Sequence, residues 1–121
     1  MAYDVAIIGA GIIGCSLARE LSRYDKKVAL IEKENDVAMG TTRANSAIIH
    51  AGYDPEPGTL MAKYNVEGNR LAGELAAELN IPFERCGSFV LAFSEEDMKT
   101  VRTLYDRGVQ SGVPGMEILD G

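Results

Sequence analysis

Three glycines and one glutamate near the start of the chain have the types and spacing that a bound dinucleotide requires. Gly9, Gly11 and Gly14 form a G-x-G-x-x-G pattern, and Glu32 follows Gly11 by 21 positions. In such a pattern the first glycine makes a tight turn, the second lets backbone N–H groups approach a pyrophosphate, and the third lets a helix pack closely. A carboxylate at Glu32 can accept hydrogen bonds from ribose hydroxyls and would repel a 2′-phosphate, which argues against NADP. These residues predict dinucleotide binding.

The surrounding residues predict the elements that would position this pattern. Tyr3–Ile8 is an apolar run typical of a buried parallel strand, Ile12–Tyr24 has helical periodicity, and Val28–Ile31 is a second apolar run. The free N–H groups and positive dipole end of the helix would favour a phosphate. We therefore predict an α/β fold that begins with a Rossmann-like βαβ unit, since a chance match would not place strands, helix and acid in this order. The cofactor-binding residues predicted in this unit are Gly9, Gly11, Ile12, Ile13, Gly14, Glu32 and Lys33.

Composition and charge restrict the class of protein. Of the 121 residues, 46% are hydrophobic and 25% are charged, which is typical of a soluble globular domain. The net charge of −6 and the lack of a basic cluster argue against nucleic-acid binding. The apolar start contains Asp4 and has no basic leader, and no apolar run has a membrane-spanning length. Cys15 and Cys86 are far apart in the sequence, and Cys15 follows Gly14 as a small packing residue, so we expect a reducing cytoplasm. The sequence has no CxxC motif and no metal-ligand cluster, so we expect no metal.

A second group of small and hydroxyl residues, Gly40–Ser46, follows a loop with no apolar periodicity. One interpretation is a plain turn with a helix cap at Thr41 or Thr42. The other is a second helix start that offers hydroxyl and N–H groups to the same pyrophosphate. Ala47–Tyr53, which contains the single histidine His50, is predicted to be a short strand or extended segment.

Three stretches together resemble the FAD-dependent D-amino acid oxidase superfamily. They are the Gly9–Gly14 pattern, the Glu32-Lys33 pair, and the order Gly40-Thr41-Thr42-x-x-Asn45-Ser46-x-Ile48-Ile49-His50-Ala51-Gly52. Within the superfamily the chain looks most like the glycerol-3-phosphate dehydrogenase and L-2-hydroxyglutarate oxidase branch. Thr42 stands where many members have serine, and it keeps the hydroxyl. The resemblance implies FAD in place of NAD, and hydride transfer from a small hydroxy acid or glycerol 3-phosphate to the flavin.

The same resemblance implies roles for the second group of residues. Thr41, Thr42 and Arg43 would lie along the diphosphate and ribityl chain, and Asn45 and Ser46 would approach the flavin ring. For His50 three roles stay open: a polar group that tunes the flavin, a base in substrate oxidation, or a hydrogen-bonded structural histidine at a strand end. A covalent flavin link through His50 is not required by the residues.

The remainder of the chain predicts two helices with a strand region between them. Thr59–Leu79 has a helical pattern, and its Lys63 and Arg70 either contact an anionic substrate or, as we favour, belong to a solvated face. Phe83–Phe93 is predicted as strand, glycine and strand, a second helix follows from Ser94, and the last residues resemble a further strand. By the family resemblance, residues 1–80 would be the FAD-binding domain and residues 81–121 the start of a mixed-sheet substrate domain.

The length suggests that this chain is the N-terminal piece of a longer enzyme. We expect it to be inactive alone, not to hold FAD by itself, and to self-associate through an unpaired strand at Gly87–Phe93. The expected location is the cytoplasm, free or peripheral to a membrane, and the expected partner is a small-molecule substrate. Two alternatives remain: an NAD-binding dehydrogenase, and a non-catalytic nucleotide-binding or interaction module complete at 121 residues.

Overall fold

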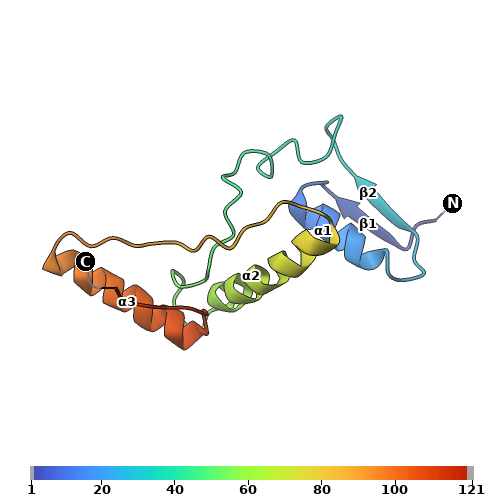
Figure 1. Cartoon of the computed structure of the whole chain (residues 1–121). Helices are drawn as coiled ribbons and strands as arrows, with labels where there is room; N and C mark the ends of the chain where they lie inside the picture. The colour runs from blue at the N-terminus through green and yellow to red at the C-terminus, as the bar shows by residue number, and fades with distance from the viewer. Residues whose placement is uncertain (1, 120–121) are drawn as a thin grey trace. The chain divides into compact units, whose positions relative to one another are not determined.

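A computed structural model describes residues 2–119 of the chain. It contains, in order, β1 (Val5–Ile8), α1 (Ile12–Leu21), β2 (Val28–Ile31), α2 (Leu60–Glu78) and α3 (Glu95–Ser111), as Figure 1 shows. The chain divides into two compact units, Met1–Ile48 and Ile49–Gly121, called the first and second unit below. The predicted domain boundary near Ile81 concerns a whole flavoenzyme and stays a prediction.

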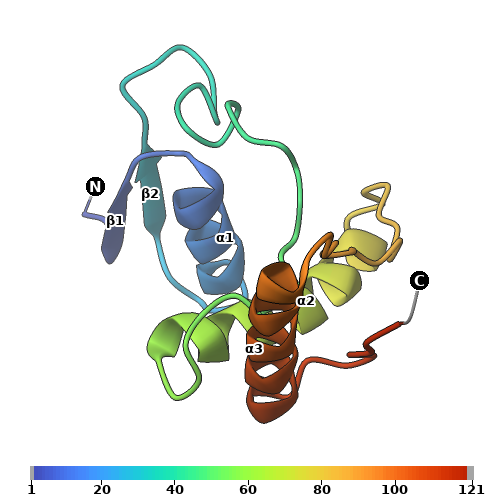
Figure 2. The ribbon, with the colours of Figure 1, turned by 90° about the vertical axis from the view of Figure 1, so that its left-hand side faces the viewer.

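The first unit is a βαβ unit. Strands β1 and β2 pair in parallel from Val5 opposite Val28 to Ile8 opposite Ile31, and α1 connects them. Figure 2 shows α1 lying along the two strands. This confirms the predicted Rossmann-like start of an α/β fold.

The prediction of a buried parallel strand at β1 is correct for the parallel pairing but wrong for the burial of most of its side chains. Ile7 is 6% exposed, whereas its neighbour Ile8 is 88% exposed. Successive side chains of a strand point to opposite faces, and α1 covers only one face of this sheet. Among the described residues, no other helix or strand of the first unit is available to cover the opposite face.

The second unit contains the two predicted helices, each begun by a hydroxyl cap. The Thr59 hydroxyl accepts a hydrogen bond from the Ala62 N–H at 3.2 Å, and the Ser94 hydroxyl accepts one from the Asp97 N–H at 3.1 Å. Helix α3 ends at Gly112, whose φ of +77° is left-handed. These caps explain why the sequence located both helices well.

The predicted strands outside the first unit are not formed. Residues 83–93 and 116–119 have no regular secondary structure, and residues 120 and 121 lie outside the described part of the chain. Residues 47–53 form no strand either, which leaves the extended segment that was the other prediction for them. A strand forms only when a neighbour takes up its N–H and C=O groups. The only sheet found in residues 2–119 has two strands, so these apolar runs have no strand beside them.

No helix within residues 2–119 is long and apolar enough to cross a membrane. The same residues contain no cluster of side chains suited to holding a metal ion.

Candidate functional site

The turn between β1 and α1 has a conformation and a packing that require glycine. Gly9 has a φ of +96° and its N–H donates to the Ile31 carbonyl at 2.7 Å, which fixes the turn to β2. A Cβ on Gly14 would lie 1.9 Å from the Gly9 oxygen, so α1 packs closer to the turn than any side chain allows. The glycine pattern therefore produces the tight turn and close helix packing that it predicts.

Glu32 holds this turn from the end of β2. One carboxylate oxygen accepts the Ala10 N–H at 2.7 Å, and the other accepts the N–H groups of Lys33 at 2.8 Å and Glu34 at 3.1 Å. The Ala10 bond, with those from Glu34 and Lys33, holds the pKa of Glu32 below its ordinary value, so the group is charged at neutral pH. Sequence reasoning predicted a ribose acceptor and missed this bracing role. The two oxygens offer about four acceptor positions, which leaves room for a ribose hydroxyl.

Thr42 connects the second group of residues to the start of α1. Its hydroxyl accepts the Ile12 N–H at 3.0 Å, although the two residues are 30 positions apart. Gly11, the N-cap residue of α1, makes no side-chain cap bond. Residues 37–43 form turns, so neither a second helix start nor a cap of a following helix is formed. Thr42 is a cap, as one interpretation held, but it caps α1.

The turn, the end of β2 and the Thr42 segment border an open cleft of about 560 Å³. This volume is within the range of small-molecule and cofactor sites. Of the residues predicted to bind the cofactor, the cleft is lined by Gly9, Gly11, Glu32, Lys33, Thr41 and Thr42. An adjoining hollow at the helix start is lined by Gly9, Gly11, Ile12, Ile13, Gly14 and Thr42.

Arg43, Asn45 and Ser46 line neither hollow. Asn45 instead shapes the chain after Thr42, because its amide donates to the Thr42 carbonyl and its side-chain oxygen accepts the Ala47 N–H at 2.6 Å. Arg43 lies on the exposed side with its guanidinium 3.6 Å from the Met39 sulfur. Their predicted cofactor contacts stay predictions.

His50 belongs to the second unit and is exposed. Its backbone carbonyl accepts a hydrogen bond from the Asn69 side chain at 3.1 Å, whereas its imidazole bonds to nothing in the part of the chain that the structure describes. The structure therefore does not support a hydrogen-bonded histidine at a strand end. Tuning the flavin and acting as a base remain open as roles. Sequence reasoning missed Asn69, because a polar residue on a helix gives no sign of a backbone contact 19 positions away.

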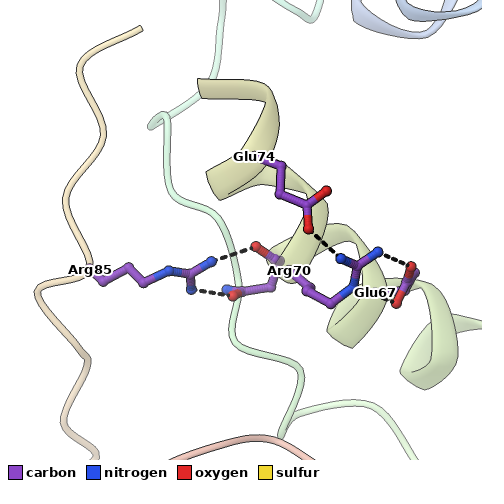
Figure 3. Close-up of polar contacts among 5 residues, drawn as sticks. Glu67, Arg70, Glu74 and Arg85 are labelled. Carbon is purple, nitrogen blue, oxygen red and sulfur yellow. Dashed lines mark hydrogen bonds and ion pairs between the residues drawn. The ribbon is translucent and has the colours of Figure 1, made fainter. Parts of the chain in front are cut away.

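The cations on α2 behave as a solvated helix face. Arg70 forms ion pairs with Glu67 and Glu74 along the same helix, as Figure 3 shows. The hydrogen bond to Glu67 and the two negative charges raise the pKa of Arg70 further above its already high value. The Lys63 ammonium lies 5.5 Å from the centre of the Tyr64 ring. This arrangement favours the solvated-face interpretation over substrate contact.

The residues of the first unit fit a dinucleotide whose ribose would be bound by the Glu32 carboxylate. A Cβ on Gly11 would lie 3.0 Å from the Thr42 hydroxyl, so a side chain there would push against the residue that caps α1. The start of α1 supplies N–H donors, Lys33 supplies a cation, and Glu32 supplies acceptors. The donor set is thus that of a nucleotide site.

Comparison with known proteins extends this result to the whole chain. A family model described as "DAO: FAD dependent oxidoreductase" matches residues 4–121. The chain is 63% identical over 117 residues to a glycerol 3-phosphate dehydrogenase of Caloramator mitchellensis, covering 97% of the chain and 24% of that protein. It is 38% identical over 120 residues to the mitochondrial L-2-hydroxyglutarate dehydrogenase of Dictyostelium discoideum, covering 98% and 27%.

A solved structure is also similar. The dithionite-reduced L-α-glycerophosphate oxidase of Mycoplasma pneumoniae with FAD bound aligns with a TM-score of 0.75 and 38% identity, over 95% of this chain and 30% of that one. The chain spans about a quarter of the length of the curated relatives it matches. Since the family is FAD-dependent, the predicted change from NAD to FAD is confirmed. The chain belongs to the DAO family of FAD-dependent oxidoreductases.

Proposed function

We propose that this chain is the FAD-binding part of an enzyme that oxidises glycerol 3-phosphate. The observation that carries the proposal is the cleft at the glycine turn, closed by Thr42 and braced by Glu32, in a chain of this family. The preference for glycerol 3-phosphate over a 2-hydroxy acid rests on the higher identity to the glycerol 3-phosphate dehydrogenase, 63% against 38%.

The residues divide into those that hold the nucleotide end and those that serve the flavin end. Ile13 offers its N–H at the helix start to the diphosphate, beside Ile12, whose own N–H already donates to the Thr42 hydroxyl. Glu32 accepts from the ribose, and Lys33 offsets phosphate charge. Thr41 and Arg43 extend the contacts along the diphosphate.

The flavin end is proposed from the family resemblance. When bound, FAD supplies the acceptor for the hydride that leaves the substrate carbon. Asn45 and Ser46 bind near the ring, and His50 either tunes the ring or takes the hydroxyl proton of the substrate. These assignments rest on the order of residues in the Gly40–Gly52 segment.

The test is expression from the complete reading frame, followed by analysis of the released cofactor. We expect a yellow protein that releases FAD and is bleached anaerobically by glycerol 3-phosphate. L-2-hydroxyglutarate and glycerol are the matched substrate controls, which lack the phosphate. Release of NAD would contradict the proposed cofactor, and faster bleaching by L-2-hydroxyglutarate would move the substrate to the 2-hydroxy acids.

We also propose that the isolated chain self-associates through Gly87–Phe93. This segment forms no strand, and Phe89 and Phe93 on it are 80% and 88% exposed. Exposed apolar side chains beside unpaired backbone groups favour pairing between copies. Sedimentation at increasing concentration should give a rising average mass, and a clean monomer throughout would contradict the proposal.

The proposed location is the cytoplasm, either free or at a membrane surface. The thiols of Cys15 and Cys86 are both free, which fits a reducing compartment. Fractionation of cells into soluble, membrane and secreted material would test it.

A further inference from the structure

The residues from His50 to Asp54, called the His50 segment below, are held by both helices of the second unit. At one end, the Asn69 side chain on α2 donates to the His50 carbonyl at 3.1 Å. At the other end, the Arg107 guanidinium on α3 donates to the Asp54 carbonyl at 3.1 Å. Both bonds go to the main chain, so they fix the path of the segment whatever its side chains are.

The middle of the segment packs closely against both helices. A Cβ on Gly52 would lie 2.7 Å from a methyl group of Val66 on α2. A Cβ on Gly108 of α3 would lie 3.1 Å from the Cβ of Tyr53. Because there is no room for a side chain on Gly52 or on Gly108, the segment lies directly against both helices.

Asn69 is itself held by a second side chain. Arg85, labelled in Figure 3, donates through Nη1 to the Asn69 side-chain oxygen at 2.7 Å and through Nη2 to the Asn69 carbonyl at 3.0 Å. A guanidinium only donates, so it must face the amide oxygen of Asn69. That leaves the amide nitrogen, the only donor of the side chain, turned toward the His50 carbonyl. Arg85 therefore sets the orientation in which Asn69 can hold His50.

The Arg85 guanidinium packs against α2 and against an aromatic ring. A Cβ on Gly73 of α2 would lie 2.9 Å from Nη2, and the guanidinium carbon lies 5.3 Å from the centre of the Phe83 ring. A glycine inside a helix is unfavourable relative to alanine. A Cβ at position 73 would require the Arg85 guanidinium to move.

We infer that Asn69 is a positioning residue for His50 and that Arg85 acts through Asn69. Together they fix the backbone of His50, whose exposed imidazole has no hydrogen-bond partner within residues 2–119 to orient it. The inference deepens the proposed function and rests on it, because it takes His50 to serve the flavin reaction. Changes to Asn69 or Arg85 should leave substrate binding unaffected, since neither side chain is assigned a contact with the substrate.

The experiment compares Asn69→Ala, Arg85→Ala and the double variant in the FAD-loaded protein made from the complete reading frame. Arg70→Ala is the matched control, since Arg70 follows Asn69 on α2 and, among the described residues, forms ion pairs only with Glu67 and Glu74. We expect Asn69→Ala and Arg85→Ala to keep FAD but to slow flavin reduction about 10- to 100-fold, the cost of a misplaced group near the reaction. KM should change little, and the reduction potential of the flavin should shift.

Two further variants separate the roles of the pair. Asn69→Asp keeps an acceptor for Arg85 but loses the donor to His50, so it should be as slow as Asn69→Ala. The double variant should be no slower than the worse single variant, because both changes break one chain of contacts. Additive losses would overturn the claim that Arg85 acts through Asn69.

Hydrogen exchange of the His50 segment tests, without reference to activity, whether Asn69 and Arg85 hold this segment, a contact called the brace below. The segment should exchange faster in Asn69→Ala and Arg85→Ala than in Arg70→Ala. Unchanged exchange, or flavin reduction as fast in Asn69→Ala as in Arg70→Ala, would overturn the inference. If the unmodified protein held no FAD, the proposed function would fail and with it the claim about the flavin, while the exchange data would still decide whether the brace exists.

Discussion

At the scale of single residues, the glycine turn is fixed by two side chains that reach it from elsewhere in the first unit. Glu32 holds the Ala10 N–H, and Thr42 holds the Ile12 N–H. The glycine spacing predicted the turn and the nucleotide site because those positions have strict steric requirements. The contacts of Glu32 and Thr42 could not be predicted, since a hydrogen bond over 22 or 30 positions leaves no local pattern.

The first prediction concerns the cap that Thr42 provides. Thr42→Val keeps the shape of the side chain but removes the acceptor for the Ile12 N–H, so it should destabilise the first unit by about 1 kcal/mol. It should also weaken FAD binding in the protein from the complete reading frame. Thr42→Ser keeps the hydroxyl and should change both quantities little. Urea unfolding and cofactor titration measure the two effects, and equal behaviour of the valine and serine variants would contradict the cap.

The second prediction uses the lowered pKa of Glu32. The folded-state pKa lies below the ordinary value of 4.5, so the stabilisation is complete above pH 4.5 and is lost as the pH falls through the folded value. The difference in unfolding free energy between the unmodified chain and Glu32→Gln should therefore shrink as the solution is acidified.

Glu56→Gln is the matched control, because the Glu56 carboxylate accepts no hydrogen bond in the described range 2–119. Urea midpoints at a series of pH values measure both differences. A Glu32→Gln difference that stays constant with pH would contradict the bracing role.

At the scale of elements, helices were predictable and strands outside the βαβ unit were not. The ends of α2 and α3 depend on local residues, chiefly the caps Thr59 and Ser94 and the left-handed Gly112. Phe83–Phe93 has the composition of a strand, but strand formation depends on a partner, and composition says nothing of one. The βαβ unit was predictable because its two strands pair with each other.

The third prediction concerns the start of α3. The Ser94 hydroxyl accepts from the Asp97 N–H and donates to the Asp97 carboxylate, which also accepts the Phe93 N–H at 3.1 Å. Ser94→Ala removes both bonds of the hydroxyl and should destabilise the second unit by about 1 kcal/mol. Ser94→Asn restores an acceptor and should recover most of the loss. Circular dichroism during urea unfolding measures the loss of stability. A Ser94→Ala variant as stable as the unmodified chain would contradict the cap.

At the scale of the whole molecule, much apolar surface is exposed in the described residues. Ile8 and Ile13 in the first unit and Phe89, Leu91 and Phe93 in the second are all well over half exposed. The sequence predicted buried positions from apolar periodicity. Apolar periodicity identifies the face of a helix or strand that would be buried by packing, but it does not show that another element packs against that face.

The fourth prediction addresses the association of whole chains. Phe89→Lys places a charge in the proposed pairing segment and should lower the average mass seen in sedimentation. Tyr24→Lys is the matched control, because Tyr24 is another exposed aromatic, 61% accessible, that lies outside the segment. If both variants lowered the mass equally, general surface charge and not Gly87–Phe93 would be responsible.

The bond between Thr42 and Ile12 has a consequence for the modularity of the nucleotide-binding motif. Strand, turn, helix and strand end at Ile31, yet the first donor of the helix is satisfied from eleven residues beyond that point. A chimera that transplanted only residues 5–33 into another host would carry the whole sequence fingerprint and lack its cap. The segment that can be transferred as a unit therefore extends at least to Thr42. A graft that includes this residue should be more stable than one that ends before it.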